Sequence, residues 1–83
     1  MNEQNLREQL QKLAAELESL PAGVPQRESI QALIADIEAQ LDGSPVDSLV
    51  DQVETAVSTF ELEHPRIAAI LNNIMVTLTS MGV

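Results

Sequence analysis

The feature that most constrains the fold is the spacing of apolar residues, which recur at alternating steps of four and three along most of the chain. Because an α-helix completes a turn every 3.6 residues, this spacing places them on one helical face. Four such stripes follow one another, and they include Leu13, Ile34, Val53 and Ile74, respectively. No segment alternates apolar and polar residues with a period of two, so the sequence predicts an all-α fold without strands.

Turn residues divide the stripes into four predicted helices, at residues 5–20, 26–42, 45–63 and 65–81. Pro21 cannot continue the first helix, and Gly43 suits the position just beyond the second. Ser44 followed by Pro45 is a typical cap and first helical residue, so we expect the third helix to begin there. The short connections predict that the helices form antiparallel hairpins.

The sequence leaves two interpretations open at the junction between the last two segments. The apolar stripe keeps its phase through His64-Pro65, as one kinked helix would require. However, Pro in a helix interior costs about 3 kcal/mol and biases the preceding residue away from helical backbone. The sequence therefore favours a break with His64 as the cap, with one kinked helix as the alternative.

Length and composition define a single small helical domain over residues 1–83 with a thin core. Phe60 is the one aromatic residue, and the lack of cysteine excludes disulfides and thiol chemistry. Two architectures fit this composition. The chain forms either a small up-down bundle or an intertwined homo-oligomer, and we expect the oligomer, preferably a dimer, because so short a chain has few partners for its apolar surface.

Charge narrows the range of possible partners. Thirteen acidic residues against four basic ones give a net charge of -9, which repels nucleic acid and anionic membranes. The N-terminus lacks the basic and apolar regions of a secretory signal, and no segment holds the roughly 20 apolar residues of a membrane span. We therefore expect a cytoplasmic protein that binds neither nucleic acid nor membrane.

The acidic residues are distributed unevenly along the chain. Residues 44–63 carry five acids and no base, whereas residues 64–83 carry a single charged residue, Arg66. A partner held by the acidic segment should be basic, and Asp51 and Glu54 are the candidate contact residues. The alternative is that these acids serve only solubility.

The nearly uncharged last segment is expected to be the most buried. Leu71, Ile74 and Leu78 should be enclosed either in the bundle or between two chains, which makes them candidate interaction residues. The uncharged strip beside them, expected at Asn73, Thr77 and Ser80, is too narrow for a full solvent face. By contrast, Leu6→Ala should be mild, because helix ends fray.

Asp47-Ser48-Leu49 is similar to the site at which acyl carrier proteins attach phosphopantetheine, which would make Ser48 a carrier residue. Carriers place apolar residues four, six and seven positions after that serine, where this chain has Gln52, Glu54 and Thr55. The simpler interpretation is that these three residues begin a helix.

Glu61 and His64 have the Glu-x-x-His spacing of di-metal helical bundles, and a dimer would supply two such pairs. Pro65 disrupts the helix that would align them, and an acid close to the single His is unremarkable at this acid content. With one His, one Lys and no glycine-rich phosphate loop, the sequence offers no catalytic arrangement. We expect no enzymatic activity, no cofactor and no metal.

Spaced groups of residues carry a resemblance to one family, namely Asp47-Ser48-Leu49-Val50, Ala56-Val57, Phe60-Glu61, His64-Pro65, Ile74-Met75, Leu78 and Met81-Gly82-Val83. The chain resembles a family of short, all-helical bacterial proteins known only as a domain of unknown function. The resemblance implies a complete cytoplasmic protein and brings no activity with it. From the residues, we expect a non-catalytic protein that acts through self-association, through helix-mediated protein binding, or both.

Overall fold

The computed structural model describes residues 2–83, which form four α-helices joined by short connections. The helices are α1 (Asn2–Leu17), α2 (Pro25–Leu41), α3 (Leu49–Phe60) and α4 (Pro65–Ser80). No strand occurs within residues 2–83. The predicted all-α class and the predicted number of helices are confirmed.

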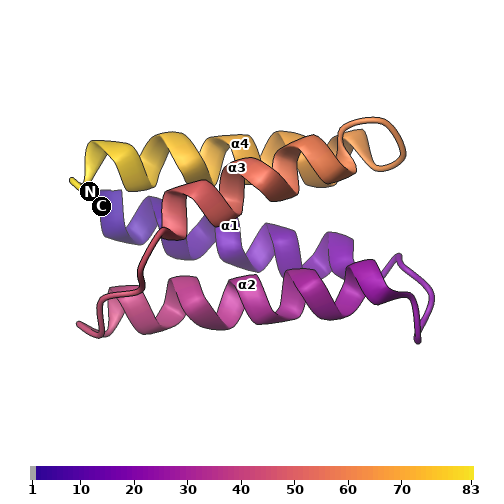
Figure 1. Cartoon of the computed structure of the whole chain (residues 1–83), viewed down its shortest axis with the longest axis horizontal. Coiled ribbons are helices and arrows are strands. Elements are labelled where there is room, and N and C mark those ends of the chain that lie inside the picture. Colours follow the sequence, from indigo (N-terminus) through magenta and orange to yellow (C-terminus); the bar gives the residue numbers. More distant parts are fainter. Residues whose placement is uncertain (1) are drawn as a thin grey trace.

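Successive helices run antiparallel, so the chain forms an up-down bundle (Figure 1). Each helix packs on two others: α1 and α3 both contact α2, and both contact α4. α4 packs most extensively, on α3 and α1, whereas α2 makes fewer contacts with its neighbours. Of the two expected architectures, this is the bundle formed within one chain.

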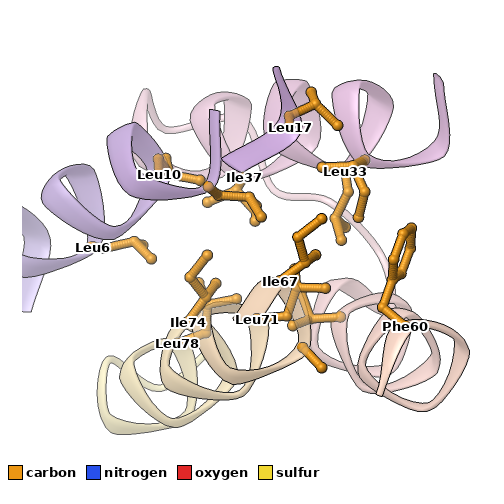
Figure 2. Close-up of a cluster of buried hydrophobic side chains, with 14 of the residues drawn as sticks. Leu6, Leu10, Leu17, Leu33, Ile37, Phe60, Ile67, Leu71, Ile74 and Leu78 are labelled. Carbon is orange, nitrogen blue, oxygen red and sulfur yellow. The ribbon is translucent and has the colours of Figure 1, made fainter. Parts of the chain in front are cut away.

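A single apolar core fills the space between the four helices (Figure 2). Each predicted stripe contributes buried side chains, among them Leu13 from α1, Ile37 from α2, Val53 from α3 and Leu71 from α4. Burying one such side chain stabilises the fold by about 1.5–3 kcal/mol. Helices as short as these are marginal alone, so their packing on one another is what stabilises them.

The junction between α3 and α4 is a break, as the sequence favours, and no kinked helix runs through it. His64 occupies the N-cap position of α4 with φ −135° and ψ 69°, which is not helical backbone. Its side chain makes no capping hydrogen bond. Instead, the His64 N–H donates to the Phe60 carbonyl oxygen at 2.8 Å, which closes the corner.

The predicted start of the third helix at Ser44-Pro45 is wrong, because α3 begins at Leu49. Gly43 adopts φ +96° after α2, and the Ser44 N–H donates to the Ala39 carbonyl oxygen at 2.9 Å. This bond satisfies a free carbonyl at the end of α2. Ser44 therefore completes α2 instead of capping α3.

The loop that follows Ser44 is held against α2 by a side chain. The Val46 N–H donates to Gln40 Oε1 at 2.9 Å, which keeps this part of the chain out of a helix. Ser48 then adopts left-handed backbone, with φ 57° and ψ 30°, a conformation that a right-handed helix cannot include. α3 starts only after this residue.

α1 is shifted by three residues towards the N-terminus at both ends relative to the expected 5–20. After Leu17 the chain tightens, because the Leu20 N–H donates to the Leu17 carbonyl oxygen, three residues back, at 3.0 Å. The Leu20 side chain still packs in the core, and Arg27 Nη1 donates to its carbonyl oxygen at 2.9 Å. The apolar stripe thus continues beyond the helix that carries most of it.

Candidate interaction surfaces

Leu71, Ile74 and Leu78 are each 0% exposed and point into the core of their own chain (Figure 2). The prediction that at least two of them are fully buried is confirmed, and the bundle itself buries them. A partner would reach these side chains only if α4 left the bundle. Recognition by the folded chain must therefore use other residues.

The exposed side of α4 carries no charged residue from Ala69 to the end of the helix. We call this surface the α4 outer face, and it consists of Ala69, Asn72, Asn73, Val76, Thr79 and Ser80. Val76 lies near its middle and is 57% exposed, one of few large apolar side chains on the surface. Arg66 lies at the start of α4, about one helical turn before Ala69, the first residue of the α4 outer face.

The expected polar strip at Asn73, Thr77 and Ser80 is wrong in one member. Thr77 is buried, and its hydroxyl group donates to the Asn73 carbonyl oxygen at 2.9 Å, so its polar group is satisfied within the helix. The solvent face is therefore displaced from the expected strip and is wider. Val76 lies two residues, about half a helical turn, from the buried Ile74 and Leu78, so helical periodicity predicts that it faces away from the core. The sequence interpretation missed it.

An acidic surface surrounds α3. It consists of Asp47, Asp51, Glu54, Glu61 and Glu63, which are all exposed. Asp51 and Glu54 lie on the helix, and the other three lie in the loops at its two ends. Within residues 2–83, no ion pair joins any of these carboxylates to a basic group.

The arginine side chains make contacts elsewhere in the bundle. Arg7 Nη2 lies 3.2 Å from Glu3 Oε1 and 3.9 Å from Asp42 Oδ1. Arg66 Nη2 lies 3.3 Å from Glu16 Oε1, a contact that links the end of α1 to the start of α4. Neither arginine pairs with the acidic surface around α3.

A groove of about 440 Å³ runs between α2 and α3. Its floor is apolar and includes Ile30, Leu33 and Phe60 from the edge of the core. It is hollow because small side chains line it, notably Ser29 and Ala56. The sequence interpretation missed this groove, since its depth depends on how far apart two helices pack.

Ser48 is exposed and directly precedes α3, so a modifying enzyme could reach its hydroxyl group. Its side chain makes no hydrogen bond to the start of the helix. Gln52 and Glu54 are both exposed on α3, where a carrier protein would present apolar residues. No feature around Ser48 beyond its exposure favours the carrier role.

Glu61 and His64 lie in the corner between α3 and α4, outside both helices. A three-residue spacing aligns two side chains on one face only inside a helix. The His64 ring packs instead against Phe60, with ring centroids 5.7 Å apart. Within residues 2–83, no group of three or more His, Asp and Glu side chains is arranged to hold a metal ion.

None of the helices formed by residues 2–83 is long and apolar enough to cross a membrane. No curated protein and no solved structure matches the chain. A family model described as "Domain of unknown function (DUF4404)" matches residues 6–83, a range that includes all of α2, α3 and α4 and most of α1. The resemblance seen in the sequence to a family of unknown function is thereby confirmed, and the chain belongs to the DUF4404 family.

Proposed function

We propose that this chain is a non-catalytic, cytoplasmic interaction protein that pairs with a second copy of itself and binds a basic protein partner. The observation that supports this proposal is the distribution of charge. Exposed acids occur on α1, on α2 and around α3, whereas the α4 outer face has none. Fractionation of the producing cells would test the location, and recovery outside the cytoplasmic fraction would contradict it.

Charge repulsion favours one surface for self-association. With a net charge of -9, two copies repel each other wherever acidic faces meet, and the α4 outer face avoids this cost. Around a two-fold axis near Val76, two α4 helices would lie antiparallel.

Sedimentation equilibrium tests the dimer directly. The wild-type mass should rise from that of one chain to that of two between about 1 and about 500 µM, the range of weak association. Val76→Glu places two like charges near the axis and should hold the chain at monomer mass without loss of helicity. Ser58→Glu adds the same charge at an exposed position on α3 and should dimerise like the wild type.

Two results would contradict the dimer. One is a wild-type protein that keeps the mass of a single chain over the whole concentration range. The other is an equal loss of dimer in Val76→Glu and Ser58→Glu, which would show that the total charge of the chain, and not the α4 outer face, governs association.

The acidic surface supports the second half of the proposal. A partner that carries Lys or Arg would be attracted to it, and salt would weaken the contact because both sides are solvent-exposed. Within residues 2–83, no basic side chain forms an ion pair with this surface, so none competes with the Lys or Arg of a partner.

A fluorescent lysine-rich peptide is a suitable probe of this surface. Its binding should weaken steeply between about 0.05 and 0.5 M salt, as expected for screened charges. The double variant Asp51→Lys, Glu54→Lys should bind it much less, whereas the pair Glu28→Lys, Glu38→Lys on α2 changes the net charge equally and should bind more than the α3 variant. Equal binding by the two variants would contradict a role for the acidic surface.

A further inference from the structure

The α2–α3 groove differs in charge from the other grooves of the bundle. A groove of similar volume, about 450 Å³, lies between α1 and α4, and Lys12, Glu16 and Arg66 give it both signs of charge. The α1–α2 groove also has one basic and one acidic lining residue. Asp36 is the single charged residue that lines the α2–α3 groove. A cationic group therefore meets no like charge in its lining.

Asp36 is partly buried, unlike the exposed acids around α3. It forms no ion pair with a basic group within residues 2–83. A carboxylate that is partly removed from water interacts more strongly with a cation than an exposed one does, because the local dielectric constant is lower. Asp36 beside an apolar floor thus suits a ligand that combines one cation with apolar groups.

The form of the groove suits a helix. Residues 25–36 of α2 line one wall, which at 1.5 Å per residue is about 17 Å, or three helical turns. Within residues 2–83 there is no strand edge that could pair with an extended peptide. A helix satisfies its own backbone hydrogen bonds and brings only side chains into the groove.

We propose that the α2–α3 groove binds an amphipathic helix of a partner protein. Apolar residues of that helix, spaced by four and three, contact the accessible lining residues Pro25, Ala32 and Ala56, beneath which Ile30, Leu33 and Phe60 are at most 5% exposed. A Lys or Arg of the same helix contacts Asp36. Asp51 lies on α3 one turn before Thr55, which lines the groove. A second basic residue of the partner helix could contact Asp51. A helix from another copy of this chain is a poor occupant, because α1, α2 and α3 each carry more acids than bases, and the apolar stripe of α4 is buried in its own core.

This inference rests on the proposed binding of a basic protein, and it adds the binding site and the form of the partner. It does not depend on the dimer. The groove is lined by α2 and α3, and no residue of α4 contributes to it. The groove and the α4 outer face share no residue, so both can be occupied in the same molecule.

The probe is a synthetic helical peptide of about 15 residues, with leucines spaced by four and three and lysines beside them. Adding it to the ¹⁵N-labelled full chain should shift the amide signals of Ser29, Ala56 and Thr59 most strongly. Ala56→Leu fills the groove and should weaken binding about tenfold or more. Asp36→Asn should weaken it about fivefold, as loss of one charge contact implies.

Ala15→Leu is the matched control, because Ala15 lines the α1–α4 groove of similar volume. This variant should bind the leucine-lysine peptide as the wild type does. Circular dichroism checks that each variant stays helical, and Asp36→Asn, which adds no volume, tests the groove even if Ala56→Leu folds poorly.

Three results would overturn the inference. The first is no binding of the leucine-lysine peptide at about 1 mM, where even weak helix–groove contacts are populated. The second is unchanged binding by both Ala56→Leu and Asp36→Asn. The third is a set of shifted signals centred on another surface. If any one of these results occurs while the Asp51→Lys, Glu54→Lys variant still loses the lysine-rich peptide, the proposed function stands and the groove is not its site.

Discussion

Burial at individual positions decides which substitutions the fold can tolerate. Leu6 is 0% exposed, as are Leu71 and Leu78. The start of α1 lies beside the end of α4 in the bundle (Figure 1), so the end of the core next to Leu78 needs a side chain from α1 to cover it. A mild effect of Leu6→Ala was expected because helix ends fray, but α1 begins four residues before Leu6. The burial of Leu6 therefore contradicts a mild effect of Leu6→Ala.

Leu6→Ala and Leu71→Ala should each lower the free energy of unfolding by about 2–5 kcal/mol, since each leaves a cavity in a closed core. Urea denaturation followed by circular dichroism measures this change. Val76→Ala, at an exposed site on α4, should change it by less than about 0.5 kcal/mol. A Leu6→Ala protein as stable as Val76→Ala would show that the start of α1 does not contribute to the core.

The buried residues could be predicted from the sequence, whereas most surface features could not. Leu71, Ile74 and Leu78 follow from helical periodicity alone, because a stripe without charges must face the interior. The exposure of Val76 depends on how α4 is rotated about its axis in the bundle. Thr77 was expected on the solvent face because it is polar, yet it is buried. The left-handed backbone of Ser48 has no signal in its own residue type, since serine rarely adopts it.

Packing is not uniform among the four helices. α4 contacts α3 and α1 extensively, whereas α2 has fewer contacts on both sides and borders the groove. A helix with fewer packed neighbours opens at a lower free energy, because less buried surface is lost when it separates. The amides of α2 should therefore be the least protected from hydrogen exchange. The same lower stability would let α2, which lines the groove, adjust to a partner helix.

Hydrogen exchange measures this order. Amides at the centre of α2, around Leu33, should exchange faster than those at the centre of α4, around Leu71, although both helices are of similar length. Adding the leucine-lysine peptide should slow exchange in α2 more than in α4. Equal protection of the two helices in the free protein would contradict the difference in packing.

Helix boundaries show what local sequence signals can and cannot determine. Pro65 and Gly43 mark the start of α4 and the end of α2 as expected, because their backbone preferences are intrinsic. Ser44-Pro45 has an equally clear local signal, yet α3 starts at Leu49. The competing contact is the hydrogen bond from Val46 to the Gln40 side chain, which a pattern of caps does not reveal.

At the scale of the whole molecule, one chain closes its own core. The argument for an oligomer from the sequence was that a short chain lacks partners for its apolar surface, but the four stripes cover one another. The large apolar side chains left exposed within residues 2–83 are Leu62, Val76 and Val83. The proposed dimer is therefore a contact between folded surfaces, and its separated chains should remain folded.

Dilution distinguishes this dimer from an intertwined one. Far-ultraviolet circular dichroism should be unchanged on dilution to about 0.5 µM, below the range in which a weak dimer persists. Val76→Glu should give the same spectrum at all concentrations. Loss of helicity on dilution would show that folding and association are coupled, as in an intertwined oligomer.

The central claim is that two copies meet through the α4 outer face, and cross-linking tests it most directly because the chain has no cysteine of its own. A disulfide forms only where two Cα atoms come within about 7 Å, which in this dimer holds close to the two-fold axis. Under mild oxidation, Val76→Cys should convert rapidly to a covalent dimer, whereas Ser58→Cys on α3 should remain monomeric. Equal cross-linking of the two variants, or faster cross-linking of Ser58→Cys, would contradict the claim.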